Sequence, residues 1–205
     1  MPRGPRFQAS GAIYHLTSRG TEGRDIYLDD LDRRLFLRVL AEVVQERNWT
    51  CGAYCLMTNH FHLLVQTLEP DLAIGMHRLN SDYANYFNRR HDHVGHLFQS
   101  RYSSEVIERE SHLLETCRYI VLNPVRAGLC RRPGRWPWSS YRATAGYDSP
   151  PAFLAVDWIL GQFATTPRRA ALRYVEFVAE GLRDAAESAV SGGLAPGHGP
   201  KWAQG

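Results

Sequence analysis

The sequence has few cysteines, a single lysine and no long apolar run, and each shortage excludes a class of protein. Its 205 residues include four cysteines at irregular spacing, too few for a disulfide-rich scaffold, so we expect free thiols that fill the core. No run of about 18 uncharged apolar residues could span a bilayer, and residues 1–6 lack the apolar segment of a secretory signal. We therefore expect a cytoplasmic protein without membrane contact.

What the sequence does contain is typical of a globular chain with a locally basic centre. Hydrophobic residues make up 44% and charged residues 22%, and the net charge is only +3. The charge is uneven: residues 78–142 hold eleven arginines against six acids, whereas residues 143–205 hold five basic and six acidic residues. Arginine suits bidentate contacts with phosphate, although a G·C-rich genome would also enrich it.

Hydrophobic periodicity predicts four strands and a series of helices. Alternating β-branched and aromatic residues indicate strands, whereas apolar steps of three and four residues indicate amphipathic helices. The expected strands cover residues 12–18, 50–57, 61–67 and 103–107. The expected helices cover residues 30–48, 72–88, 112–121, 139–145, 152–163 and 167–182.

The order of these elements predicts an α+β fold. Up to the fourth strand it matches the split βαβ pattern of a ferredoxin-like sandwich, in which an antiparallel sheet carries helices on one face. The helix after the fourth strand is an addition to that pattern. We expect a main domain over residues 1–132 and a C-terminal helical extension packed on it over residues 133–184. Residues 185–205, rich in Ala, Gly, Ser and Pro, are expected to be disordered.

Two histidines flank a phenylalanine at the start of the third expected strand. Alternation along His60-Phe61-His62 directs both imidazoles to one side of the sheet. An apolar strand cannot bury two imidazoles cheaply unless they have partners, so this pair is a candidate metal site. A second pair, His91 and His93, lies in a polar loop where histidine is ordinary.

A tyrosine and an asparagine four residues apart form the second candidate feature. On a helix, Tyr119 and Asn123 share a face, and a carboxamide oxygen is a suitable ligand for Mg²⁺ or Mn²⁺. The structural alternative is that Asn123 caps a new helix starting at Pro124 and that Tyr119 belongs to the core. The residues alone leave both interpretations open.

Several segments, taken together and in order, resemble the single-tyrosine HUH transposases, in particular the REP-associated tyrosine transposases and their insertion-sequence relatives. The resemblance spans roughly residues 10–180, and its joint occurrence is more specific than any single motif. The segments are CLMTNHFHLLV at residues 55–65, NRRH at 88–91, GHLFQSRY at 95–102, RYIVLNPVRAG at 118–128 and WPWSSYR at 136–142.

The resemblance implies a metal-dependent catalytic domain, residues 1–132, that cleaves and rejoins single-stranded DNA beside hairpins formed by palindromic repeats. It assigns His60 and His62 as metal ligands, Tyr119 as the nucleophile that forms a 5′-phosphotyrosine intermediate, and Asn123 as a third ligand. Mg²⁺ or Mn²⁺ would be the cofactor, and a homodimer is compatible with it. Thr58 stands where many relatives have proline.

A DNA substrate needs a basic track and stacking surfaces. We expect Trp136 and Trp138 to pack in the protein rather than stack on bases. The expected DNA contacts come from the basic centre and the glycine-rich loop before it: Arg19, Arg24, Arg78, Arg89, Arg90, His96, Gln99, Arg101 and Arg126.

Two other functions fit parts of the sequence. One is a zinc hydrolase in which His60, His62 and a third histidine, His15 or His96, activate water. The other is a non-catalytic nucleic-acid module that stacks bases on a ferredoxin-like sheet and needs no metal. A covalent DNA adduct that depends on Tyr119 would separate the transposase from both.

Overall fold

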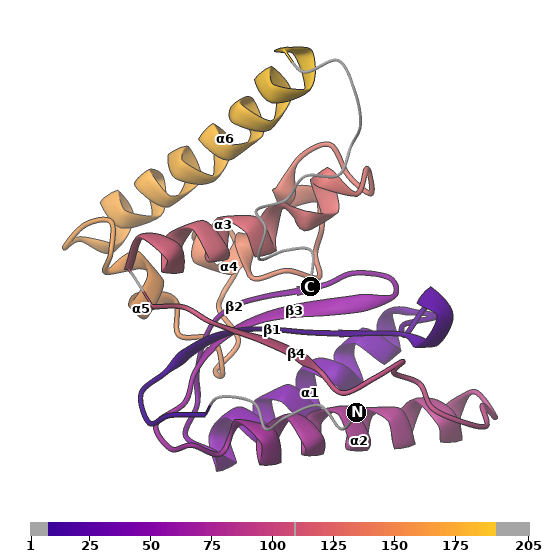
Figure 1. The fold of residues 1–205 in the computed structure, drawn as a ribbon. Coiled ribbons are helices and arrows are strands. Elements are labelled where there is room, and N and C mark those ends of the chain that lie inside the picture. The colour runs from indigo at the N-terminus through magenta and orange to yellow at the C-terminus, as the bar shows by residue number, and fades with distance from the viewer. Residues whose placement is uncertain (1–7, 109, 192–205) are drawn as a thin grey trace.

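The architecture is a four-stranded antiparallel sheet with helices on both faces (Figure 1). A computed structural model describes residues 8–108 and 110–191 of the chain. The strand order is β2-β3-β1-β4, with every neighbouring pair antiparallel. This is the order of a ferredoxin-like sandwich, so the predicted fold class is confirmed. The strands are β1 (Ile13–Arg19), β2 (Thr50–Leu56), β3 (His60–Gln66) and β4 (Ser103–Val106).

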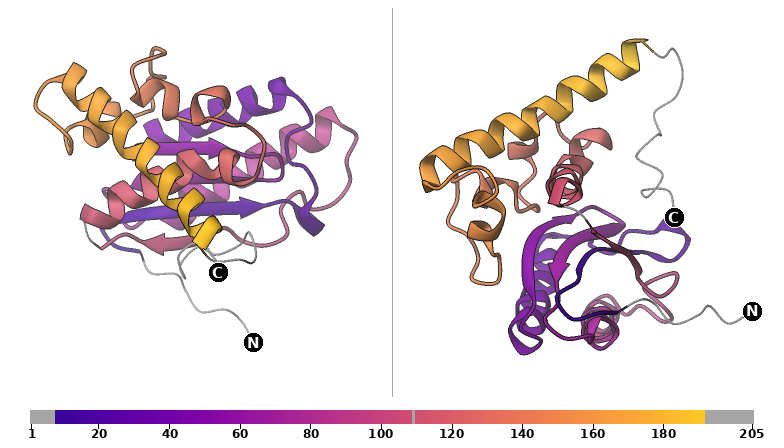
Figure 2. Two further views of the ribbon diagram at one scale, coloured as in Figure 1. Left: turned by 90° about the horizontal axis from the view of Figure 1, so that it is seen from above. Right: turned by 60° about the vertical axis from the view of Figure 1, so that its left-hand side comes forward.

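The two helices of the sandwich lie on one face, and the additional helices lie on the other. Figure 2 shows α3 and α2 nearly end-on, on opposite sides of the sheet. The first face carries α1 (Asp30–Glu46) and α2 (Leu72–Arg90). The opposite side carries α3 (Glu110–Arg126), α4 (Tyr141–Thr144), α5 (Val156–Leu160) and α6 (Pro167–Ser191). Among the described residues, no helix has the length and apolar content to cross a bilayer.

Strict alternation along β1 and β3 builds the core under the sheet. Tyr14 and Leu16 of β1, and Phe61 and Leu63 of β3, are fully buried against α1 and α2. The start of α1 is fixed by Asp29, whose carboxylate accepts hydrogen bonds from the backbone N–H groups of the first turn in a capping box. Such a cap satisfies donors that a helix start otherwise leaves unpaired. The capping box therefore fixes the residue at which α1 begins on this face of the sheet.

Helix α3 continues past the point where the sequence predicted its end. The expected end at residue 121, and with it the capping role of Asn123, is wrong because Pro124 lies inside the helix. Proline removes the backbone donor that would bond to the Ile120 carbonyl, and the Asn123 side chain donates to the neighbouring Tyr119 carbonyl at 2.9 Å. The helix ends at Arg126, and Gly128 just beyond it has a φ of 71° and flanking 5→2 and 6→1 hydrogen bonds that form a Schellman motif.

The C-terminal extension packs on both the sheet edge and α3. The indole of Trp136 donates to the Leu56 carbonyl at 3.0 Å, and the Arg33 guanidinium lies over the rings of Trp136 and Trp138 at 5.8 and 5.5 Å. The predicted packing role of both tryptophans is confirmed. Helix α6 crosses the outer side of α3 (Figure 1) and runs to Ser191, beyond the expected end at residue 182. The disorder expected after residue 184 falls partly on residues 192–205, which lie outside the described residues.

Candidate active site

The two histidines of the HxH motif lie on the α3 side of the sheet, as alternation requires. Phe61, between them, is buried on the opposite face. The ring centroids of His60 and His62 are 5.0 Å apart, with the ring planes nearly perpendicular. The Met57 N–H bonds to the His60 carbonyl at 2.9 Å, which closes the expected hairpin turn around Thr58. The motif therefore begins β3 on a backbone fixed by the turn.

His60 has a hydrogen-bond partner that fixes its orientation. Its Nδ1 lies 2.7 Å from the Asn59 side-chain oxygen, and the Asn59 amide nitrogen donates to the Gly23 carbonyl at 2.8 Å. Burial, and then the charge of the facing Arg19, lower the pKa of His60 to about 4. The imidazole is therefore neutral at physiological pH, the form that can bind a metal ion.

His62 is buried against a third imidazole, that of His15 on β1. The two rings stack with centroids 5.1 Å apart, and His15 Nε2 lies 2.9 Å from His62 Nδ1. The other nitrogen, His62 Nε2, is buried and has no hydrogen-bond partner among the described residues. Burial, followed by the two neighbouring histidines, holds the pKa of His62 well below its ordinary value.

Tyr119 on α3 faces this pair of imidazoles. Its ring meets His62 and His15 edge-on, at centroid distances of 5.7 and 5.9 Å, and the Arg126 guanidinium lies 5.1 Å from its ring centre. Burial raises the pKa of the phenol, whereas Arg126 and a hydrogen bond with the Asn123 side chain oppose that rise. The pKa of Tyr119 is raised on balance, so Arg126 and the amide offset only part of the burial that disfavours the phenolate, the form that a nucleophile needs.

The residues at this point fit a divalent cation with open coordination positions. Two neutral imidazoles converge, one with a buried nitrogen that lacks a partner, and the Asn123 amide lies on the facing helix beside Tyr119. Nitrogen ligands with an amide oxygen are compatible with Mn²⁺ or Mg²⁺, which keep sites for substrate oxygens. Among the described residues, no cluster of three or more His, Cys, Asp or Glu could hold an ion. The three-histidine zinc site therefore has no support, because His15 bonds to His62 and His96 is exposed in a loop.

Most of the expected DNA-contacting residues gather at the end of the sheet where β3 begins. The loop after β1 and the loop before β4 are joined there, by hydrogen bonds from the Thr21 N–H to the Leu97 carbonyl and from the Gln99 N–H to the Arg19 carbonyl. The loop after β1 also lies beside the hairpin turn that precedes His60, because the Ile26 N–H donates to the Thr58 carbonyl. This end of the sheet, which we call the basic edge, has five exposed side chains from the predicted set: Arg19, Arg24, His96, Gln99 and Arg101.

Two residues of the predicted DNA-contacting set lie away from the basic edge, and carboxylates engage their guanidinium groups. Arg78 pairs with Glu46, and with Asp82 at 3.4 Å, between α1 and α2 on the other face of the sheet. Arg90 pairs with Asp29 and Asp32 at the start of α1. Helical periodicity marked both positions as polar but did not reveal the acids that meet them. Arg89 is exposed at the end of α2, and Arg126 lies over Tyr119.

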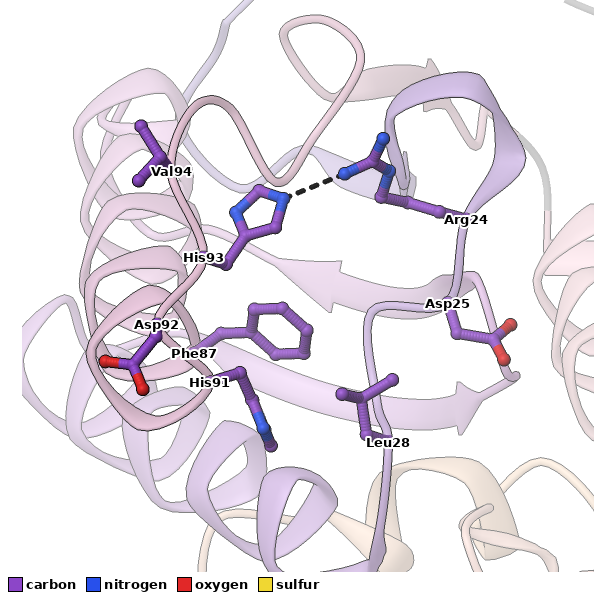
Figure 3. A pocket seen from close by; sticks show the side chains of 8 residues that line it. All are labelled: Arg24, Asp25, Leu28, Phe87, His91, Asp92, His93 and Val94. Atoms are coloured by element: carbon purple, nitrogen blue, oxygen red, sulfur yellow. Dashed lines mark hydrogen bonds between the residues drawn. The ribbon is translucent and has the colours of Figure 1, made fainter.

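A pocket of about 470 Å³ opens beside the basic edge (Figure 3). The Phe87 ring lies between His91 and His93, with centroids 4.6 and 6.0 Å away. Arg24 lies across the opening and bonds to His93 at 2.8 Å, and Leu28 faces the rings with 59% of its surface exposed. His91 and His93 thus line this pocket instead of sharing one ligand.

Two further residues, His15 and Glu105, lie on the α3 side of the sheet; together with His60 and His62 they form what we call the polar face. The sequence indicated His15 only as a zinc ligand and gave no signal for Glu105. Glu105 pairs with His15 across β1 and β4, one of its oxygens is buried without a hydrogen-bond partner among the described residues, and burial raises its pKa. Alternation places both on the His62 side, but only the strand order brings them beside β3.

Comparison with known proteins yields a consistent set of similarities. Residues 8–123 match the family model described as "Transposase IS200 like". A Haemophilus influenzae protein described as a REP-associated tyrosine transposase is 25% identical over 142 residues, which cover 64% of this chain and 80% of that protein. A solved structure of a REP-associated tyrosine transposase bound to a REP hairpin superimposes with a TM-score of 0.64 at 17% identity, covering 76% of this chain and 92% of that one. This last similarity concerns the fold.

Proposed function

The chain belongs to the IS200-like transposase family, and from that premise we propose that it cleaves and rejoins single-stranded DNA through a covalent bond to Tyr119. The observation that carries this proposal is the edge-on contact of the Tyr119 ring with His62 at 5.7 Å. It joins a nucleophile on α3 to a pair of potential metal ligands on β3.

His60 and His62 would hold a divalent cation through their Nε2 atoms, with the Asn123 amide oxygen as a further ligand. Mg²⁺ or Mn²⁺, when bound, supplies positive charge that polarises a phosphate oxygen and stabilises charge developing in the transition state. The low pKa of His60 keeps its ligating nitrogen free of a second proton at neutral pH. The chain thus supplies a rigid, neutral pair of nitrogens for the ion.

Tyr119 carries out the nucleophilic step. Its oxygen attacks phosphorus as the phenol proton passes to solvent, and the O–P bond forms. The bond from phosphorus to the 3′ oxygen breaks, and that oxygen takes up a proton from solvent and leaves as a 3′-hydroxyl. Arg126 stabilises the phenolate through its position over the ring. Because no water is consumed, another 3′-hydroxyl can attack the phosphotyrosine and reseal the strand. Phosphotyrosine is suited to this reversal because phenolate is a better leaving group than an alkoxide.

The basic edge binds the single strand that leads to this site. Its arginines contact phosphates: Arg101 is exposed at this edge, and Arg24 has only a 3.6 Å contact with the exposed Glu22 carboxylate. One unpaired base enters the pocket lined by Phe87 and His93, where apolar and ring surfaces stack on it. Because the structurally similar transposase is bound to a REP hairpin, we take a hairpin formed by a palindromic repeat as the structured part of the substrate.

The test is formation of a covalent protein–DNA adduct. The purified chain is incubated with Mn²⁺ and an oligonucleotide containing a hairpin repeat from the flanking genome, and the adduct is followed by denaturing gel and mass spectrometry. We expect an adduct with the unaltered chain and none with Tyr119→Phe or after chelation. Tyr83→Phe is the matched control, because that phenol bonds to the Ile26 carbonyl on the opposite face and should leave the adduct intact.

Two results would contradict the proposal. An adduct that persists in Tyr119→Phe would exclude this tyrosine as the nucleophile. Cleavage without any adduct would indicate attack by water, as in a hydrolase.

A further inference from the structure

His15 stands out on the polar face because it contacts a proposed metal ligand without being placed to share the ion. Only 6% of its surface is exposed, and its ring is nearly parallel to that of His62, with 14° between the planes. Its Nε2 faces Nδ1 of His62 at 2.9 Å. The hydrogen bond therefore uses the His62 nitrogen opposite the one that lacks a partner.

The neighbouring histidine shows how such a bond controls a ligand. The Asn59 amide nitrogen is held by the Gly23 carbonyl, so the amide oxygen must face His60. An oxygen can only accept, and His60 Nδ1 must therefore carry the hydrogen. This leaves a lone pair on His60 Nε2, because a neutral imidazole has one donor and one acceptor nitrogen. Asn59 thus fixes the ligand form of His60.

The partner of His62 is the His15 imidazole, which can either donate or accept a hydrogen bond, so it does not by itself fix the His62 tautomer. If His62 Nδ1 donates to His15, His62 Nε2 has a lone pair and can bind a cation. If His15 Nε2 donates instead, His62 Nε2 carries a hydrogen and cannot bind one. In the second arrangement a buried N–H would also remain without a hydrogen-bond partner among the described residues, which costs free energy.

We propose that His15 is a positioning residue that accepts the hydrogen of His62 Nδ1 and thereby holds His62 in the tautomer that can ligate a divalent cation. This inference rests on the proposed function, since it assumes that His62 is a ligand. His15 itself touches neither the ion nor the DNA. Partners of this kind, placed behind a metal-bound histidine, typically contribute about 10–100-fold to metal affinity.

The experiment compares two substitutions that differ in hydrogen bonding. His15→Phe keeps a flat ring but has no acceptor, whereas His15→Gln places an amide oxygen near the position of Nε2. We expect Mn²⁺ affinity, measured by the electron paramagnetic resonance of free Mn²⁺, to fall about 10–100-fold in His15→Phe and to recover largely in His15→Gln. Imidazole ¹⁵N shifts of the metal-free protein should show His62 protonated on Nδ1 in the unaltered chain and mixed in His15→Phe.

A thermal melt of each variant separates misfolding from the expected effect. If His15→Phe is unstable, His15→Gln decides the question alone. Retained Mn²⁺ affinity with His62 protonated on Nδ1 supports the inference, because a flexible amide cannot replace an imidazole that serves only to pack. Loss of both overturns it. Unchanged Mn²⁺ affinity and an unchanged His62 tautomer in His15→Phe would overturn the inference while leaving the proposed function intact. If His62→Ala bound Mn²⁺ like the unaltered chain, the ligand assignment in the proposed function would fail, and this inference with it.

Discussion

The two faces of the sheet are built by the same strands but have different roles. On the α1 and α2 face, Tyr14, Leu16 and Phe61 are fully buried in a continuous apolar core. One residue along each strand, His15 and His62 point to the α3 face, where their imidazoles are buried beside a second apolar core formed by Leu64, Ile120 and Val121. Both faces gain free energy by excluding water, but the buried imidazoles lie on the α3 face. The comparison indicates that strand alternation places the candidate site on one of two apolar faces.

The largest expected effect comes from comparing alanine substitutions at two adjacent residues that point to opposite faces of the sheet. Phe61→Ala should lower the free energy of unfolding by about 3–5 kcal/mol, because it opens a cavity in the core. His62→Ala should cost much less stability but abolish Mn²⁺ binding and the covalent adduct. Thermal melts and Mn²⁺ titrations of both variants make the comparison. A His62→Ala protein as unstable as Phe61→Ala, with metal binding retained, would show that the polar face is structural.

Alternation is the reason that so much of this arrangement could be predicted. The pattern in residues 60–66 placed His60 and His62 on one side and Phe61 on the other, and the structure confirms it. The strands themselves were predicted to within a residue or two, because runs of β-branched, aromatic and apolar residues between turn signals mark most of their length. Local periodicity was therefore sufficient for the fold and for the direction of the histidines.

The predictions that failed depended on contacts distant in sequence or on a compensated local preference. A residue before proline usually leaves the helical region, yet Asn123 stays helical and its side chain bonds to the Tyr119 carbonyl. Gly128, a common helix terminator, was the signal for the true end of α3. The pairing of His15 with His62 links residues 47 positions apart, and periodicity within one strand carries no information about it.

A smaller effect should distinguish arginines at the basic edge from those held by carboxylates. Arg101→Gln removes an exposed cation near the proposed site, so single-strand affinity should fall several-fold at low salt, and the slope of log affinity against log salt should decrease by about 1. Arg78→Gln serves as the control, because its guanidinium is already paired with Glu46 and Asp82 on the other face. Equal losses in the two variants would mean that net charge, rather than the basic edge, attracts DNA.

The smallest expected effect concerns the pocket beside the basic edge, and it depends on apolar contact instead of charge. Leu28 at this pocket and Leu172 on α6 are each 59% exposed, so substitution by alanine removes the same apolar surface at two sites. Leu28→Ala should weaken single-strand binding about threefold, less than the roughly 1–3 kcal/mol of a full stacking contact because Leu28 supplies only part of the surface, and Leu172→Ala should leave it unchanged. Because neither substitution alters charge, the Leu28→Ala loss should be the same at low and moderate salt, unlike that of Arg101→Gln. If the loss of affinity in Leu28→Ala disappeared with added salt, the pocket would act only through the charge of Arg24. No base would then be packed against the rings that line the pocket.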